Sequence, residues 1–303
     1  MAESIFIGFD GGGSTSRFIV KNGENEPEIF SYPLNLKYTD IGIEDSVNGF
    51  VNCLQEILGE DILRLRGICI SLSGASTESA NKGFVTILRK KLYLPEFNIN
   101  IESDSSFTLD AAYPNEDSGL LLIAGTGSVA IAKERNGKIM KIGGWGRFLG
   151  DEGSGYWIGL QTLRYYCRVL DGIEEGGDLF ERVQQILLLE AGQEFAVIRR
   201  KLYRNEIKPQ NFAPLVFNNV RDLHASDIIR DASFKLFNII TELWRKVKDE
   251  CKPVITLHGQ IAGQPMIYDY INEQSTALGL ECKILEGKAV LQRALEMAIS
   301  LAE

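Results

Sequence analysis

Histidine is almost absent from this chain, which carries only two in 303 residues, His224 and His258. Two imidazoles provide little material for a His-rich metal centre or for a Ser-His-Asp triad. The simpler expectation for both is packing or a surface position. The sequence therefore disfavours triad hydrolases and imidazole-rich metal sites.

Cysteine is sparse, and the five cysteines lie far apart without a CxxC motif: Cys53, Cys69, Cys167, Cys251 and Cys282. This spacing suggests neither a disulfide framework nor a local metal or iron–sulfur knuckle. We expect free thiols that are mostly buried.

Long apolar runs are also missing, because none approaches the ~20 residues needed to span a bilayer, and no basic segment leads into an apolar one at the start. The net charge is -9 and the pI is about 5.0, so the overall field repels nucleic acid and anionic membranes. We expect a cytoplasmic protein without a nucleic-acid or membrane partner.

Length and composition are those of an ordinary globular protein with two domains: 303 residues, 45% hydrophobic and 24% charged. The expected lobes are residues 1–116 and residues 117–287, and a closing amphipathic helix over 288–303 is expected to pack back on the first lobe.

One strand–turn–strand unit occurs twice. An apolar run at Ile5 to Phe9 ends at Asp10 and a glycine turn, and Leu120 to Ala124 likewise runs into Gly125-Thr126-Gly127-Ser128. Each turn feeds a second apolar run that an Asn-Gly turn closes. The repetition suggests two lobes of related construction, each opening with a hairpin.

Apolar spacing predicts the other elements. Strands are expected at 65–72, 97–102, 254–257 and 282–285, and helices at 46–58, 107–112, 156–170, 179–189, 195–203, 228–247 and 288–301. The second lobe should therefore be mostly helical.

Both glycine turns combine backbone N–H groups with a hydroxyl, which are the components of an anion-binding nest. Neither is a Walker A loop, because Arg17 and Lys133, the first basic residues after the turns, come too late. The second turn matches GxGxxA, but a strand is expected after it, where a dinucleotide fold needs a helix. The turns therefore favour phosphate binding of another kind.

The stretch from Gly143 to Trp157 is the richest in glycine, with six glycines, two tryptophans and the adjacent acids Asp151 and Glu152 in fifteen residues. Close backbone approach, flat apolar faces and a carboxylate acceptor together suit a sugar ring. The alternative is a structural turn in which Trp145 and Trp157 anchor the core.

Asp10 and Asp104 each follow a predicted strand. A carboxylate beside an anion nest can hold a hydrated magnesium ion, and a second carboxylate can accept the proton of an attacking hydroxyl. For Asp104 a structural interpretation stays open as well, because Ser103-Asp104-Ser105-Ser106 before a helix is also good N-capping sequence.

Five segments in this order, IGFDGGGSTS, SLSGAS, ESDSS, LIAGTGS and GGWGRFLGDEGSGYWIG, resemble the N-acetylglucosamine kinase branch of the BadF/BadG/BcrA/BcrD ATPase family. The resemblance covers the first 160 residues and thins after about Leu170. It implies an α/β, two-lobed actin-like ATPase (ribonuclease H-like) fold, in which each lobe is a mixed sheet flanked by helices and an ATP/sugar cleft lies between the lobes.

The resemblance also implies roles for individual residues. Asp104 would be the general base, Asp10 would hold Mg²⁺ through water, and Gly259 would mark the adenosine segment. The sugar would contact Asn35, Gly144, Trp145 and Asp151. The phosphates of ATP would contact Gly11, Gly12, Gly13 and Ser14 in the first turn, and Gly125, Thr126, Gly127 and Ser128 in the second.

The expected activity is ATP-dependent phosphorylation of an amino sugar, first of all N-acetylglucosamine at its 6-hydroxyl, by a homodimer. Kinases for glucosamine, N-acetylmannosamine or N-acetylmuramic acid would share most of these residues. Two functions of a different class stay open: a BadF-type ATPase that activates a partner enzyme, and a sugar sensor without catalysis. Gln260, where many relatives have a second glycine, leaves the nucleotide preference open.

Overall fold

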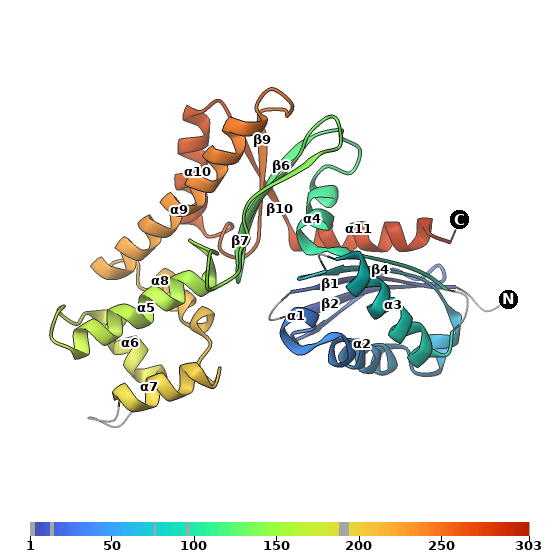
Figure 1. The fold of residues 1–303 in the computed structure, drawn as a ribbon, viewed down its shortest axis with the longest axis horizontal. Coiled ribbons are helices and arrows are strands. Elements are labelled where there is room, and N and C mark those ends of the chain that lie inside the picture. Colours follow the sequence, from blue (N-terminus) through green and yellow to red (C-terminus); the bar gives the residue numbers. More distant parts are fainter. Residues whose placement is uncertain (1–3, 13–14, 76, 95–96, 188–193, 303) are drawn as a thin grey trace. The chain divides into compact units, whose positions relative to one another are not determined.

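The computed structural model describes residues 4–12, 15–75, 77–94, 97–187 and 194–302. The chain divides into two compact units (Figure 1), one of Met1–Asn115 with Leu285–Glu303 and the other of Glu116–Ile284. Each unit is built on its own five-stranded mixed sheet flanked by helices. This is the α/β architecture of two mixed sheets that the resemblance implies.

The two sheets have the same construction. In each, three successive strands form an antiparallel meander, and a later strand pairs in parallel with the first of them. The first sheet has the order β3 (Glu28–Tyr32), β2 (Ser16–Asn22), β1 (Ile5–Gly11), β4 (Leu65–Leu72), β5 (Asn98–Ser103). The second has the order β10 (Glu281–Leu285), β9 (Val254–His258), β6 (Gly119–Ala124), β7 (Ser128–Lys133), β8 (Ile139–Gly143). The shared order confirms the two related hairpins predicted from the repeated unit.

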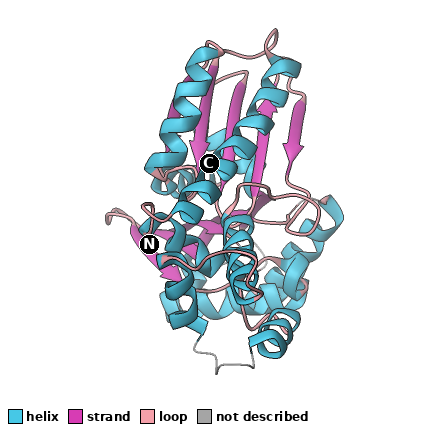
Figure 2. Ribbon diagram, turned by 90° about the vertical axis from the view of Figure 1, so that its left-hand side faces the viewer, coloured by secondary structure: helices cyan, strands magenta, loops and turns pink. Residues whose placement is uncertain are grey.

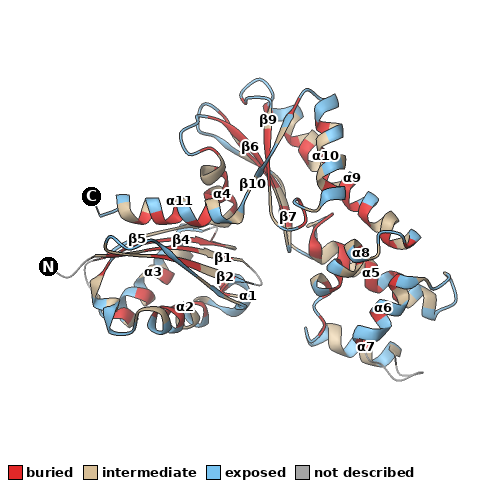
Figure 3. Cartoon of the chain, turned by 180° about the vertical axis from the view of Figure 1, so that it is seen from behind, coloured by how far each residue is buried: buried red, intermediate tan, exposed pale blue. Residues whose placement is uncertain are grey.

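The core of the first unit lies on both faces of its sheet. Helices α2 (Ile43–Leu58) and α3 (Glu78–Leu92) cover one face, and α4 (Asp104–Ala112) and α11 (Gly287–Ser300) cover the other (Figure 1). Buried residues of these helices face the strands (Figure 3). Phe9 makes tilted and edge contacts with Phe18 and Phe50 at centroid distances of 4.7 and 4.8 Å, and these aromatic contacts add to the burial of apolar area.

The closing helix α11 packs against the first sheet at very short range. A Cβ added to Gly67 of β4 would lie 2.2 Å from the backbone oxygen of Ala298 in α11. Only glycine therefore permits this approach of helix to strand. The packing places the last helix of the chain beside its first strand.

The second unit buries one face of its sheet under helices. The long helix α9 (Leu223–Val247) and α10 (Pro265–Ala277) lie along that face (Figure 2). The remaining helical elements are α5 (Gly155–Leu170), α6 (Asp178–Leu187), α7 (Glu194–Tyr203), η2 (Pro209–Phe212) and α8 (Ala213–Asn218). The expectation of a mostly helical second lobe is confirmed.

Several elements have no clear apolar periodicity and were not predicted. Strand β3 is an edge strand with exposed residues and a proline close to each end, and α10 has a polar run from Asn272 to Thr276. The short elements α1 (Tyr38–Ile41) and η1 (Gly59–Arg64) were also not predicted. Helix α3 was missed although its buried Phe84, Leu88 and Leu92 recur every four residues. The predicted helix over 179–189 ends beyond the described residues, because 188 and 189 are not among them.

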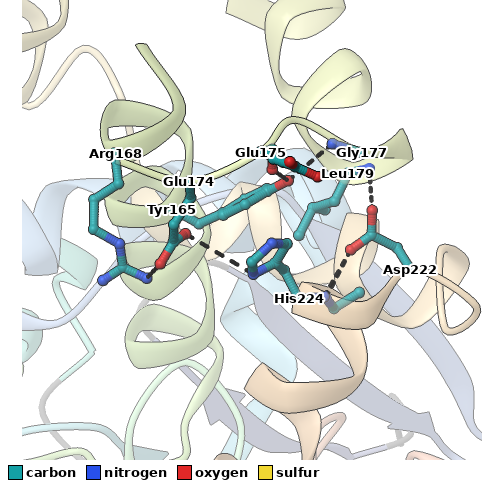
Figure 4. Close-up of polar contacts among 9 residues, drawn as sticks. Tyr165, Arg168, Glu174, Glu175, Gly177, Leu179, Asp222 and His224 are labelled. Carbon is teal, nitrogen blue, oxygen red and sulfur yellow. Dashed lines mark hydrogen bonds and ion pairs between the residues drawn. The ribbon is translucent and has the colours of Figure 1, made fainter. Parts of the chain in front are cut away.

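Asp222 caps two helices at once (Figure 4). Its Oδ1 accepts from the backbone N–H groups of His224 and Ala225 at 2.9 and 3.1 Å, which caps α9. Its Oδ2 accepts from the backbone N–H of Leu179 in the first turn of α6 at 3.0 Å. One carboxylate thus joins two helices through residues 43 positions apart in the sequence. The cap also explains why α9 begins five residues before the predicted Ile228.

The side chains around this double cap are also engaged (Figure 4). The ring of His224 stacks on Tyr165 at a centroid distance of 4.1 Å, which confirms its packing role. The Tyr165 hydroxyl donates to the carbonyl of Glu175 and accepts from the N–H of Gly177. Burial raises the pKa of this phenol, so it stays protonated and able to donate at neutral pH.

Replacing Asp222 with alanine is expected to lower the free energy of unfolding by about 2 kcal/mol or more. It removes the cap of α9, and it leaves the Leu179 N–H without its acceptor. Asp222→Asn is the matched variant, because one amide oxygen can still cap α9 while its NH₂ group cannot accept from Leu179. Urea denaturation should rank the proteins wild type, Asn, Ala. Equal stability of all three would contradict the double cap.

Candidate functional site

The three parallel strands of the first unit end at one edge of the sheet. Gly11 of β1 is in register with Leu72 of β4, and Leu72 is in register with Ser103 of β5. Asp10 and Asp104 therefore belong to this edge, at the carboxyl ends of strands two positions apart, roughly 10 Å from backbone to backbone. In open α/β sheets, ligands bind beyond the carboxyl ends of the strands.

Asp10 is held by two side chains. Arg17 Nη2 donates to its Oδ2 at 2.5 Å, and the Ser71 hydroxyl donates to its Oδ1 at 3.4 Å. Asp10 and Arg17 are directly opposite each other in the β1–β2 hairpin, so the pairing follows from the register. The sequence analysis excludes Arg17 as the basic residue of a Walker A loop and does not predict its ion pair with Asp10. The sequence does contain an indication of this pair, because Asp10 and Arg17 flank the glycine turn symmetrically.

The first glycine turn is described only in part. The N–H of Gly12 donates to the carbonyl of Thr15 at 3.0 Å, which closes the turn at its base. Gly11 ends β1. Gly13 and Ser14, which were predicted to contact phosphate, lie outside the described residues.

The cap of helix α4 is Ser103, not Asp104. The Ser103 hydroxyl accepts from the backbone N–H of Ser106 at 3.3 Å. Asp104 is the first residue of the helix, and its Oδ1 accepts from the N–H of Ser105 at 2.7 Å. The capping interpretation was therefore correct for the segment but wrong for Asp104, whose half-buried carboxylate lies at the positive end of α4.

Asn35 lies in the loop after β3 and shapes a local turn. Its Oδ1 accepts from the N–H of Lys37 at 2.9 Å, and its Nδ2 donates to Asp40 at 3.3 Å. This is an Asx turn, so Asn35, the predicted sugar ligand, also fixes the backbone of its own loop.

In the second unit, the second glycine turn is joined to the start of α5. The N–H of Gly155 donates to the carbonyl of Gly125 at 2.8 Å, and that of Tyr156 donates to the carbonyl of Thr126 at 3.1 Å. The Ser128 hydroxyl donates to the carbonyl of Glu152 at 2.9 Å. The predicted phosphate turn and the end of the predicted sugar loop are therefore one hydrogen-bonded frame.

The predicted sugar loop leaves large apolar side chains exposed. Trp145 is 75% exposed, and Phe148 and Leu149 after it are exposed as well. Trp157 instead packs against the core of the second unit, with the Lys235 ammonium 5.6 Å from its ring centre. The structural interpretation with both tryptophans as core anchors is wrong for Trp145 and right for Trp157. Gly144 closes the base of the loop, because its N–H donates to the carbonyl of Ser128 at 3.0 Å.

Asp151 lies against the candidate phosphate turn. The backbone N–H of Ser128 donates to its Oδ1 at 3.3 Å, and its Oδ2 lies 2.9 Å from where a Cβ on Gly127 would stand. Asp151 has a φ of 60°, in the left-handed region that aspartate tolerates better than most residues. The candidate sugar carboxylate and the candidate phosphate turn are thus in direct contact.

The predicted adenosine segment reaches the same sheet edge. Strand β9 runs parallel to β6 with His258 in register with Ile123, and Gly259 follows. The N–H groups of Ile261 and Ala262 both donate to the carbonyl of Ala124, at 2.9 and 3.1 Å. Three of the predicted ligand segments therefore converge on the end of β6.

Few side chains that could bind a metal ion lie close together in the part of the chain that the structure describes. No group of three or more His, Cys, Asp or Glu side chains there could hold a metal ion. All five cysteines are free, and Cys53, Cys69 and Cys251 are buried. Burial raises the pKa of the Cys69 thiol to about 12, so it is inert as a thiolate nucleophile at neutral pH.

Residues 7–279 match the BadF/BadG/BcrA/BcrD ATPase family. The chain belongs to that family. Membership of this ATPase family implies ATP as a substrate. Over the residues that the structure describes, the helices are too short or too polar for a membrane span.

Curated relatives of this family member are sugar kinases. An N-acetyl-D-glucosamine kinase of Dictyostelium discoideum is 27% identical over 295 residues, covering 90% of this chain and 91% of the relative. An N-acetylmuramic acid/N-acetylglucosamine kinase of Clostridium acetobutylicum is 25% identical and covers 87% of both chains. A solved structure from Chromobacterium violaceum, named as a candidate N-acetylglucosamine kinase, has a TM-score of 0.75 over the whole of both chains at 22% identity. That likeness confirms the fold.

Proposed function

We propose that this chain is an ATP-dependent amino-sugar kinase that phosphorylates N-acetylglucosamine at its 6-hydroxyl. The observation that carries the proposal is the contact of Asp151 with the turn from Gly125 to Ser128, because phosphoryl transfer to a sugar requires that sugar and phosphate sites adjoin. The kinase names of the two curated relatives, each aligned over most of its length, support N-acetylglucosamine as the substrate. The choice of the 6-hydroxyl rests on the sequence resemblance.

Binding roles follow the predicted positions. The sugar hydroxyls would be bound by Asp151 and Asn35 and by the backbone at Gly144, with Trp145 as an apolar face. The phosphates would be bound by the two glycine turns, Gly11 to Ser14 and Gly125 to Ser128, through backbone N–H groups and hydroxyls. Gly259 would lie beside adenosine.

Asp104 would be the general base. Phosphoryl transfer needs little covalent help from a protein, so the main contributions are alignment of the hydroxyl and stabilisation of charge. A carboxylate that accepts the hydroxyl proton adds to these contributions. Excluding water from the aligned substrates would limit ATP hydrolysis.

The residues at the edge of the first sheet fit a magnesium ion held through water. Asp10 offers carboxylate oxygens beside the Ser71 hydroxyl, and Arg17 already occupies Oδ2. Mg²⁺ prefers to keep several waters and to bind through one or two carboxylates and the phosphates of its substrate. When bound, it would supply positive charge to the phosphoryl oxygens. We also propose a homodimer, from the family resemblance alone. A cytoplasmic location stays a prediction from the sequence.

A coupled assay of ADP formation across a panel of amino sugars tests this function. We expect turnover above the sugar-free rate with N-acetylglucosamine, and less or none with glucosamine, N-acetylmannosamine and N-acetylmuramic acid. The phosphorylated position is then read by NMR of the product. Turnover with one of the other three sugars but not with N-acetylglucosamine would replace the proposed substrate. No sugar-dependent turnover with any member would contradict the kinase assignment.

A further inference from the structure

If the proposed function is correct, two anions compete for the backbone N–H of Ser128: the carboxylate of Asp151 and a phosphate of ATP. In the structure it donates to Oδ1 of Asp151 at 3.3 Å. A nest binds phosphate with these backbone N–H groups, and one N–H makes one good hydrogen bond at a time. Asp151 therefore stands where a phosphate oxygen would accept.

The charge of Asp151 adds to this conflict. Its second oxygen lies 2.9 Å from the Cβ position of Gly127, so the whole carboxylate is laid over the turn. A negative charge in that place repels the phosphates of ATP, and the repulsion is strong because Asp151 is half-buried. At Ser128 and Gly127 the carboxylate therefore opposes a phosphate by its volume, by its hydrogen bond and by its charge.

Hydrogen bonds fix the backbone around this contact, so movement of the Asp151 side chain alone would be enough to break it. The carbonyl of Asp151 accepts from the N–H of Ser154 at 3.1 Å, and α5 begins directly afterwards. The N–H groups of Gly155 and Tyr156 are bonded to the turn itself. A rotation of the Asp151 side chain would release Ser128 without disturbing this frame.

We propose that Asp151 is a latch that couples sugar binding to nucleotide binding. Without sugar, its carboxylate occupies the Ser128 N–H and repels the phosphates. A bound sugar donates hydroxyl hydrogen bonds to the carboxylate and draws it off the turn, which frees the N–H for phosphate. The proposal rests on the proposed function, and because linkage is reciprocal, nucleotide would raise sugar affinity by the same factor.

The test is titration calorimetry with a non-hydrolysable ATP analogue in the absence of any sugar. Asp151→Asn removes the charge, and Asp151→Gly removes the side chain while accepting the φ of 60°. Both variants are expected to bind the analogue about fivefold or more tightly than wild type. A residue that only bound sugar would leave this affinity unchanged, and one that only ordered the turn would lower it on removal; either result would overturn the latch.

Two controls complete the experiment. Glu152→Gln removes the neighbouring exposed acid, whose carbonyl and not its side chain bonds Ser128, and should leave the sugar-free affinity at the wild-type value. In wild type, N-acetylglucosamine should raise analogue affinity about fivefold or more. Absence of this rise would also overturn the proposal. None of these titrations needs turnover, so a chain that phosphorylates no sugar would fail the kinase assignment separately.

Discussion

Asp104→Asn is expected to cut sugar-dependent turnover by roughly 100-fold or more, because the amide cannot accept the proton of the attacking hydroxyl. Affinity for an ATP analogue should stay near the wild-type value. The fold should survive, since Ser103 and not Asp104 caps α4, and loss of one charge at a helix start costs only about 0.3–1 kcal/mol. Steady-state kinetics with calorimetry of the analogue separates the two effects.

Asp110→Asn is the matched control for this variant. Asp110 lies on the same helix and accepts from Arg293 of α11 at 2.8 Å, in an ion pair that is partly exposed. Such pairs contribute about 1 kcal/mol or less, so turnover should change little. If Asp104→Asn turned over sugar as fast as Asp110→Asn does, the general-base assignment would be wrong.

Gly259→Ala is expected to lower the free energy of unfolding by about 3 kcal/mol and to weaken nucleotide binding at least about tenfold. Gly259 has a φ of 104°, where an L-residue is strained. An added Cβ would lie 2.5 Å from the carbonyl oxygen of Ala124 and 3.1 Å from the N of Gly125. These are backbone atoms at the entry to the second candidate phosphate turn, so relief of the clash must displace that turn.

Gly279→Ala separates strain from collision. Gly279 also has a positive φ, of 76°, but a Cβ there would meet nothing within 4 Å. This control should lose only about 1–2 kcal/mol and keep its nucleotide affinity. Thermal unfolding and calorimetry of both variants check the difference. Equal losses in the two would show that the contact between Gly259 and Ala124 does not matter.

Local sequence predicted the parts of the fold in which each residue's role is set by its neighbours along the chain. β4 was predicted over the full range from Leu65 to Leu72, because a buried apolar run ends there at Ser73-Gly74. α5 was predicted to within one residue, because apolar residues at helical spacing follow a glycine-rich loop. The edge strand β3 and helix α10 were missed because their apolar pattern is weak. The start of α9 was missed because its cap, Asp222, lies in a polar stretch before the periodic residues.

The candidate site shows the same division. The glycine turns, Asp10, Asp104 and Asp151 were all picked out from residue type and from their places at strand ends or in a glycine-rich loop. The sequence alone thus determined two related lobes, two glycine turns that are candidates for phosphate binding, and the carboxylates near them. The partners of these carboxylates could not be predicted from residue type and position alone. The exception is the pair of Asp10 with Arg17, which follows from the register of the β1–β2 hairpin.

Only the tertiary structure decided what Asp151 touches. Twenty-three residues separate it from Ser128, and their meeting depends on β8 folding back beside β7 and on α5 starting at Gly155. Such contacts join residues far apart in the sequence and depend on the packing of several elements at once. The conformational preferences of neighbouring residues therefore do not predict them. The fold therefore places the carboxylate that the sequence indicated as a sugar ligand against the candidate phosphate turn.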